Sequence, residues 1–288
     1  MMAKYTLKPA TKRKYHRKST MSKTEIMLIT ILFHDSGYRS LKHFFLEKIC
    51  KQICDFFLKV VLYNCFVELG KEVAIPLAMF IKKMLLGKCT GISFVDCSPL
   101  LVCKNQRIHI HKTFKGIAQR GKCSMSWFFK FKLHLICNEC GKLLNFMITN
   151  SDIDDRKPLG YKFFVEFIYG KLVGDKGYIS KNLFERLFVY GIQLITKLES
   201  NMKGALMSVS DKPLLGKRAI IEAINDELKN AAKTEHSMHR TFDNFIVNLL
   251  CAIAAYSCFP KKPCINVLRT IDTQLTLFRI RRTHVIYI

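Results

Sequence analysis

The chain has 288 residues, with 47 lysines and arginines against 22 aspartates and glutamates, and a formal net charge of +25 at pH 7. Hydrophobic residues make up 49% of it, which excludes a wholly disordered protein, and no apolar stretch reaches the ~18 residues of a membrane span. Twelve scattered cysteines and no secretory signal predict reduced thiols in a cytoplasmic protein. The large positive charge favours a polyanionic partner, with nucleic acid as the first candidate and no membrane.

Both ends of the chain are rich in basic residues. Residues 1–24 hold eight lysines or arginines and no aspartate or glutamate, so we expect a flexible arm over 1–22 that contacts phosphates. A solvated segment without contacts explains the same composition equally well. Residues 261–288 are expected to form a divergent basic tail, either an added strand or helix or translation beyond a damaged stop codon.

A small helical domain is predicted over residues 23–88. Ser22 and Glu25 have the spacing of a capping box and precede an apolar run, which predicts the start of a first helix. A second helix is expected from Ser40, and a third from Tyr63 with a kink at Pro76. Lysines are frequent on these helices. This pattern favours DNA binding, although a solvated helix face accounts for any single lysine.

Beyond residue 88 the pattern changes to strands that alternate with helices. Alternating side chains over 130–135 and 144–148, separated by turn residues at 138–141, predict an antiparallel hairpin. Further strands are predicted at 91–96, 171–174 and 192–197, and helices at 158–169, 180–190 and 217–234. The predicted fold class is therefore α/β, a mixed sheet flanked by helices over 89–260, preceded by the small all-helical domain.

Acidic residues are scarce, which makes their positions informative. Asp96 ends one predicted strand, Asp175 follows another, and Glu222 lies on the helix predicted from residue 217. Arg218 lies one turn before Glu222, and Lys229 lies two turns after it on the same helix face. Taken alone, each acid is more often a strand-end turn, a helix cap or part of a solvated face. Their combination carries the information.

Several motifs around these residues are similar to those of one enzyme family. They are GKCTGISFVD (87–96), FKGIA (114–118), FKLHL (131–135), DDRKPL (154–159), GDKGYIS (174–180), KRAIIE (217–222) and EHSMHR (235–240). With them, residues 89–265 resemble a DDE transposase of a bacterial insertion sequence, specifically the family numbered nine-eighty-two. Residues 22–88, including LFHDSGY at 32–38, resemble the helical N-terminal part of that family. The tyrosine that a wider transposase group carries three positions before the signature arginine is replaced here by Leu215.

The resemblance implies a ribonuclease-H-like catalytic core with Asp96, Asp175 and Glu222 as the catalytic, metal-binding triad. Two Mg²⁺ ions, for which Mn²⁺ could substitute, would neutralise charge on the attacking and leaving oxygens of a phosphodiester. Asp96, on the central strand, is the candidate for contact with both ions. The family's Arg-x3-Glu-x6-Lys signature falls on Arg218, Glu222 and Lys229.

The resemblance also implies the partners and the reaction. Arg218, Lys229 and Lys176 would bind DNA phosphates beside the acids. The substrate would be double-stranded DNA, both the element ends and the target, and the chain could act as a homodimer in the cytoplasm at the nucleoid. The expected activity is metal-dependent cleavage and strand transfer at the ends of its own insertion sequence. The alternatives are an inactive, transposase-derived DNA-binding protein and a host nuclease on the same core.

Other candidate sites have simpler explanations. Asp152, Asp154 and Asp155 could hold a metal, but acids before a proline are also ordinary chemistry for a loop and a helix start. Cys137 and Cys140 resemble half of a zinc site, yet no second pair follows at a suitable spacing. Trp127 could stack on a flipped base, but packing in the core is the simpler explanation. Two histidine pairs are expected to contact phosphates or solvent and not a metal; they are His109 with His111, and His236 with His239.

Overall fold

The computed structural model describes residues 21–104, 114, 119–122, 127–197, 211–234 and 241–266. The basic arm before Met21, both histidine pairs and most of the predicted tail lie outside the described residues, as does the side chain of Trp127. Within the described ranges, no helix is long and apolar enough to cross a membrane.

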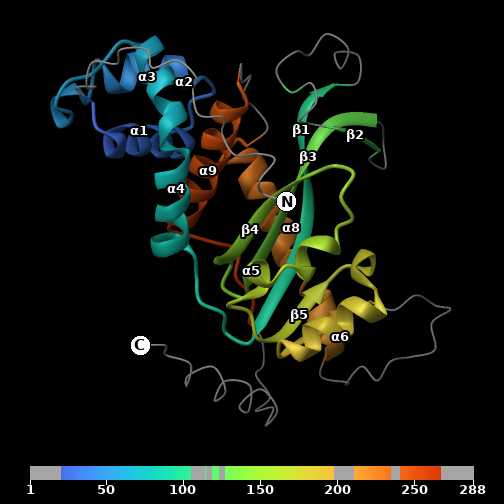
Figure 1. Ribbon diagram of the computed structural model, residues 1–288. Coiled ribbons are helices and arrows are strands. Elements are labelled where there is room, and N and C mark those ends of the chain that lie inside the picture. Colours follow the sequence, from blue (N-terminus) through green and yellow to red (C-terminus); the bar gives the residue numbers. More distant parts are fainter. Residues whose placement is uncertain are drawn as a thin grey trace, which may run out of the picture.

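Six strands form one sheet in the described part of the chain (Figure 1). They are β1 (Ile92–Lys104), β2 (Gln119–Lys122), β3 (Trp127–Asn138), β4 (Leu143–Asn150), β5 (Gly170–Gly174) and β6 (Ile192–Thr196). β1 pairs antiparallel with β3 and parallel with β5, which pairs parallel with β6. β2 and β4 both pair antiparallel with β3, along successive parts of the edge opposite β1. The order β4-β3-β1-β5-β6 confirms the predicted mixed sheet and is consistent with a ribonuclease-H-like fold.

Helices precede the sheet and cover both of its faces. The α-helices are α1 (Lys23–Asp35), α2 (Leu41–Phe44), α3 (Tyr63–Gly70), α4 (Ala74–Phe80), α5 (Lys162–Val165), α6 (Lys181–Val189), α7 (Lys212–Gly216), α8 (Ala219–Asn230) and α9 (Phe242–Cys258). Shorter 3₁₀ or π turns are η2 (Phe45–Ile49), η3 (Cys54–Phe56), η4 (Lys71–Val73), η5 (Ile81–Leu85), η7 (Lys157–Gly160) and η8 (Lys176–Tyr178).

The N-terminal helices follow the predicted order, with shorter segments. The capping box at α1 is confirmed, because Ser22 Oγ accepts from Glu25 N–H and Glu25 Oε2 accepts from Ser22 N–H. The predicted long helix from Tyr63 is instead α3, η4, α4 and η5 in succession. Pro76 lies in the first turn of α4, just after the 3₁₀ turn η4, where its missing N–H costs no helical hydrogen bond.

The predicted helix at 158–169 is also shorter in the structure. Tyr161 is extended, with φ −88° and ψ 120°, and separates η7 from α5. The turn at 138–141 is confirmed, because Asn138 Oδ1 accepts from the backbone N–H groups of Cys140 and Lys142.

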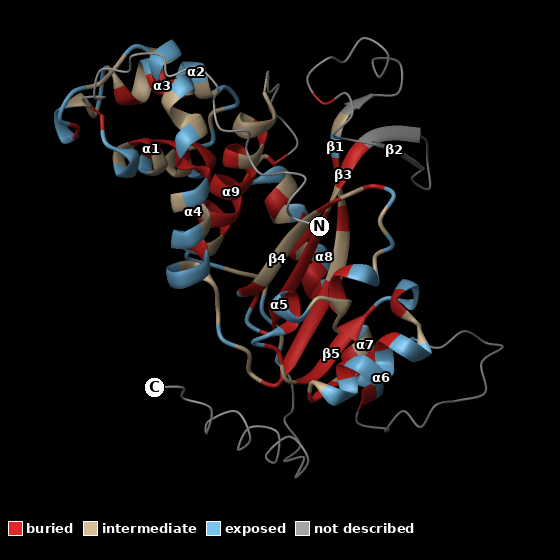
Figure 2. Ribbon diagram, in the orientation of Figure 1, coloured by how far each residue is buried: buried red, intermediate tan, exposed pale blue. Residues whose placement is uncertain are grey.

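Two hydrophobic cores lie on opposite faces of the sheet. Alternation along each strand separates them: Val95 and Leu172 face α5 and α6, whereas Phe94 and Val173 face α8 and α9. Figure 2 shows the buried residues concentrated in the sheet and in α9. α9 is apolar on nearly all sides, as expected for a helix with the sheet on one side and the N-terminal helices on the other.

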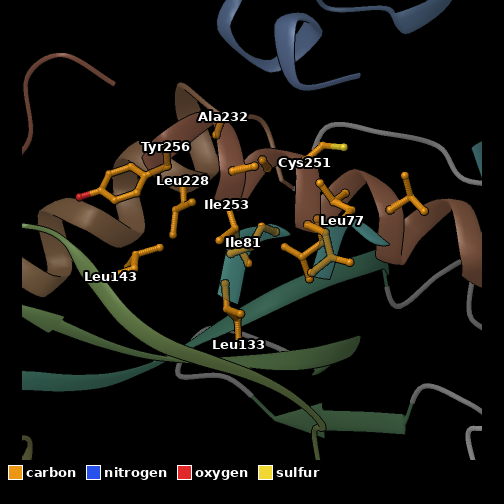
Figure 3. Close-up of a cluster of buried hydrophobic side chains, with 14 of the residues drawn as sticks. Leu77, Ile81, Leu133, Leu143, Leu228, Ala232, Cys251, Ile253 and Tyr256 are labelled. Carbon is orange, nitrogen blue, oxygen red and sulfur yellow. The ribbon is translucent and has the colours of Figure 1, made fainter. Parts of the chain in front are cut away.

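The N-terminal helices and the sheet share one continuous core through α9. Leu77 and Ile81 of α4 and η5 gather with Ile253 of α9 and Leu133 of β3 (Figure 3). The division into separate domains at residue 88 stays a prediction. The shared core means that removing residues 1–88 would expose the apolar side of α9.

The glycine at the tip of the β3–β4 hairpin is a position where we expect substitution to destabilise the fold. Gly141 has φ +70°, and a Cβ there would lie 2.2 Å from the carbonyl oxygen of Pro263. Gly37 also has a positive φ, +75°, but a Cβ there would meet nothing within 4 Å. Gly37→Ala should cost about 1–2 kcal/mol of unfolding free energy from backbone strain alone.

Gly141→Ala should cost about 1–3 kcal/mol more than Gly37→Ala, because the segment around Pro263 must also move. Urea unfolding of the two variants beside the parent measures the difference. Equal losses would show that the contact with Pro263 carries no weight.

Candidate active site

The central strand β1 holds the first of the three predicted acids. Asp96 is partly buried, its side chain 21% exposed, on the face of the sheet that α8 covers. Its Oδ2 accepts a hydrogen bond from Asn225 Nδ2 of α8 at 2.9 Å. Burial raises the pKa of the Asp96 carboxyl above its usual value, while a hydrogen bond from the Cys97 backbone and the charge of Arg218 act in the opposite direction. This carboxylate therefore sits where additional positive charge would stabilise it.

The second acid lies beside the first because β1 and β5 are parallel neighbours. Phe94 pairs with Val173, so Asp96 and Asp175, each two residues further along, come to the same level of the sheet. β5 ends at Gly174, and Asp175 begins the turn η8 at its carboxyl end. The side chain of Asp175 is 57% exposed.

The third acid reaches this place from α8, which packs against β1. Arg218, at the N-cap of α8, connects all three predicted acids. Its Nη1 lies 3.7 Å from Asp96 Oδ1 and 3.8 Å from Asp175 Oδ1. Its Nη2 forms a close ion pair with Glu222, one turn further along the helix. Three carboxylates from a central strand, a strand end and a helix thus surround one guanidinium group.

Asn225 is a member of this cluster that the sequence analysis missed. It lies three residues after Glu222, and therefore on the same face of α8. Besides the bond from its Nδ2 to Asp96, its Oδ1 is buried and has no hydrogen-bond partner among the described residues. The helical spacing from Glu222 was the signal that could have identified it.

Of the two predicted phosphate-binding lysines, one directly follows an acid of the site and the other lies two helical turns away from one. Lys176 directly follows Asp175 and is exposed. Lys229 is half-buried in the last turn of α8, about 10 Å along the helix axis from Glu222 at 1.5 Å per residue. Leu215, where the wider transposase group has a tyrosine, is partly buried and packs against the core on the α8 and α9 face of the sheet.

The acids of the loop after β4 do not gather into one site. Asp154 accepts hydrogen bonds from Arg156, which lower the pKa of the Asp154 carboxyl to about 2. Asp155 instead pairs with Lys132 of β3 at 2.7 Å. This arrangement supports the loop interpretation of the acidic run.

The fold and the site together define the class of the protein. A mixed sheet of this order with three clustered carboxylates over its central strand is the arrangement expected of a ribonuclease-H-like enzyme. The family model described as "Transposase DDE domain" matches residues 86–242, more than half of the chain. The chain belongs to this transposase family. No curated protein matches the sequence. Membership implies a DNA-binding phosphoryl-transfer enzyme of a family that typically binds divalent metals.

Proposed function

We propose that the chain is the transposase of an insertion sequence, of the family numbered nine-eighty-two, which cleaves DNA at the element ends and joins it to a target. Asp96, Asp175 and Glu222 are the proposed catalytic residues. The observation that carries the proposal is their convergence around Arg218 from segments far apart in the sequence. Acids so close together need cations, and Arg218 alone leaves a net negative charge.

The residues of this cluster fit divalent magnesium. Carboxylate and amide oxygens are hard ligands of the kind that Mg²⁺ and Mn²⁺ prefer. The buried Oδ1 of Asn225, which has no hydrogen-bond partner in the part of the chain that the structure describes, is a further oxygen beside Asp96. Asp96, Asp175 and Glu222 would hold two ions, with Asp96 in contact with both. The ions would supply charge neutralisation at the attacking and leaving oxygens of the phosphodiester.

The basic residues of the site would orient the DNA. The guanidinium of Arg218 carries donors in a planar fork that suits phosphate as well as carboxylate, so it can exchange its acidic partners for a DNA phosphate. Lys176, exposed beside Asp175, can contact a phosphate at the mouth of the site. Lys229 lies two turns beyond Glu222 on α8, where it would contact a phosphate further along the DNA.

The remaining parts of the proposal concern where the DNA binds. Exposed lysines decorate the N-terminal helices, and we assign recognition of the element ends to this part of the chain; they include Lys23, Lys42, Lys51, Lys82 and Lys83. A homodimer would hold two ends together, and the protein would act in the cytoplasm at the nucleoid. Binding should weaken steeply with salt, because each phosphate contact releases counterions.

The test uses the full chain and the DNA that flanks its gene. We expect strand cleavage at the element ends in Mg²⁺ or Mn²⁺, none in EDTA, and products with free 3′-hydroxyl groups that join to a target. Binding of the ends without cleavage in either metal would instead assign the inactive DNA-binding alternative. Cleavage without preference for the ends would assign a general nuclease.

A further inference from the structure

A second group of potential metal ligands lies behind the central strand. Because side chains alternate along β1, Cys97 points to the face of the sheet opposite Asp96, the face that α5 and α6 cover. Cys97 pairs directly with His134 of β3. Asp155, from the loop after β4, completes the group. One ligand atom from each of these three residues lies within 4.8 Å of the other two.

The distance between the cysteine sulfur and the histidine nitrogen is close to the distance between two ligands of one metal ion. Cys97 Sγ and His134 Nε2 are 4.0 Å apart. Sulfur and nitrogen bound to one tetrahedral zinc, at about 2.3 and 2.0 Å, would be separated by roughly 3.5 Å. A contraction of about half an ångström, within reach of side-chain rotation, would therefore bring both atoms to bonding distance.

The histidine of this group is in the chemical form that binds metals. His134 is 1% exposed, and its buried Nδ1 has no hydrogen-bond partner within the described ranges. Its Nε2 contacts Thr149 Oγ1 at 2.8 Å. Burial lowers the pKa of the His134 imidazole to about 4, so the ring is neutral at pH 7. With the proton on Nδ1, the lone pair lies on Nε2, the nitrogen that lies 4.0 Å from Cys97 Sγ, and a bound metal would replace the contact of Nε2 with Thr149.

A lysine holds the carboxylate in place. Lys132 Nζ donates at 2.7 Å both to Asp155 Oδ1 and to the backbone carbonyl of Ile153. Hydrogen-bonded partners of this kind orient the ligating groups of metal sites. A carboxylate accepts at both of its oxygens, so the contact with Lys132 leaves Asp155 able to bind a cation.

We propose that Cys97, His134 and Asp155 bind one divalent transition metal of the zinc class, at a site distinct from the one around Asp96. A thiolate and an imidazole select Zn²⁺ or a similar ion over Mg²⁺. Binding replaces the thiol proton of Cys97, which is released to solvent, with a bond from sulfur to the metal. The bound ion would join the loop after β4 to β1 and β3, directly behind the strand that carries Asp96.

The test uses Co²⁺ as a spectroscopic probe and Zn²⁺ as its competitor on the full, reduced, metal-free chain. We expect one equivalent of Co²⁺ to produce thiolate-to-cobalt absorption that Zn²⁺ abolishes. Cys97→Ala should lose this absorption, and Asp155→Asn should weaken Co²⁺ binding at least tenfold. Cys140→Ala and Asp154→Asn are the matched controls, because each removes the same type of group outside the cluster, and both should bind as the parent does.

Two outcomes would overturn the site. One is a parent chain that shows no thiolate-to-cobalt absorption, and the other is absorption that persists in Cys97→Ala. Circular dichroism checks folding, and Asp155→Asn, at a half-exposed loop position, tests the site if Cys97→Ala does not fold.

Discussion

Asp96→Asn is expected to reduce Mg²⁺-dependent cleavage of end DNA by about three orders of magnitude or more. The substitution keeps the size and shape of the side chain but removes the charge at the centre of the acidic cluster. Affinity for end DNA should stay within a few fold of the parent, because recognition is assigned to other parts of the chain. Single-turnover cleavage and a binding titration, both on the full chain, measure the two quantities separately.

Asp154→Asn is the control for this experiment. Asp154 is an exposed carboxylate paired with Arg156 and takes no part in the cluster around Arg218, so this variant should cleave at nearly the parent rate. If Asp154→Asn, rather than Asp96→Asn, abolished cleavage, the catalytic residues would have been assigned to the wrong acids. Normal cleavage by Asp96→Asn would have the same meaning.

Lys171→Met is expected to lower the free energy of unfolding by about 3–5 kcal/mol. Lys171 Nζ of β5 lies 2.9 Å from Asp211 Oδ1, at the start of α7, and the two side chains are 8% and 2% exposed. Removing the lysine leaves a buried carboxylate without this partner. Urea unfolding of the variant and the parent measures the loss.

Two further variants test whether burial is the cause. The double variant Lys171→Met/Asp211→Leu should regain most of the loss, because it removes both buried charges together. Lys51→Met breaks the exposed pair with Glu47, also at 2.9 Å, and should cost only a few tenths of a kcal/mol. Similar losses for Lys51→Met and Lys171→Met would show that burial does not set the effect.

Local patterns in the sequence were enough to predict five of the six described strands of the sheet. The hairpin of β3 and β4 could be predicted because its two strands and the turn between them are adjacent in the sequence. Each strand shows apolar residues at alternate positions, the pattern that is typical of a half-buried strand. α9 was not predicted, because a helix that is apolar on nearly all sides lacks the one-sided periodicity that identifies surface helices. β2 was also missed, since four residues such as Gln119–Lys122 carry no clear alternation and owe their conformation to β3.

The sequence by itself determined the mixed α/β class, because strand and helix periodicity are local properties of the chain, and the resemblance of its motifs to a transposase family supplied the candidate acids. Only the tertiary structure decided which distant groups meet. The parallel register of β1 and β5 brings Asp175 level with Asp96, and the packing of α8 on β1 adds Asn225. The antiparallel register of the neighbouring strands β1 and β3 also places Cys97 opposite His134. No local pattern in the sequence specifies this register.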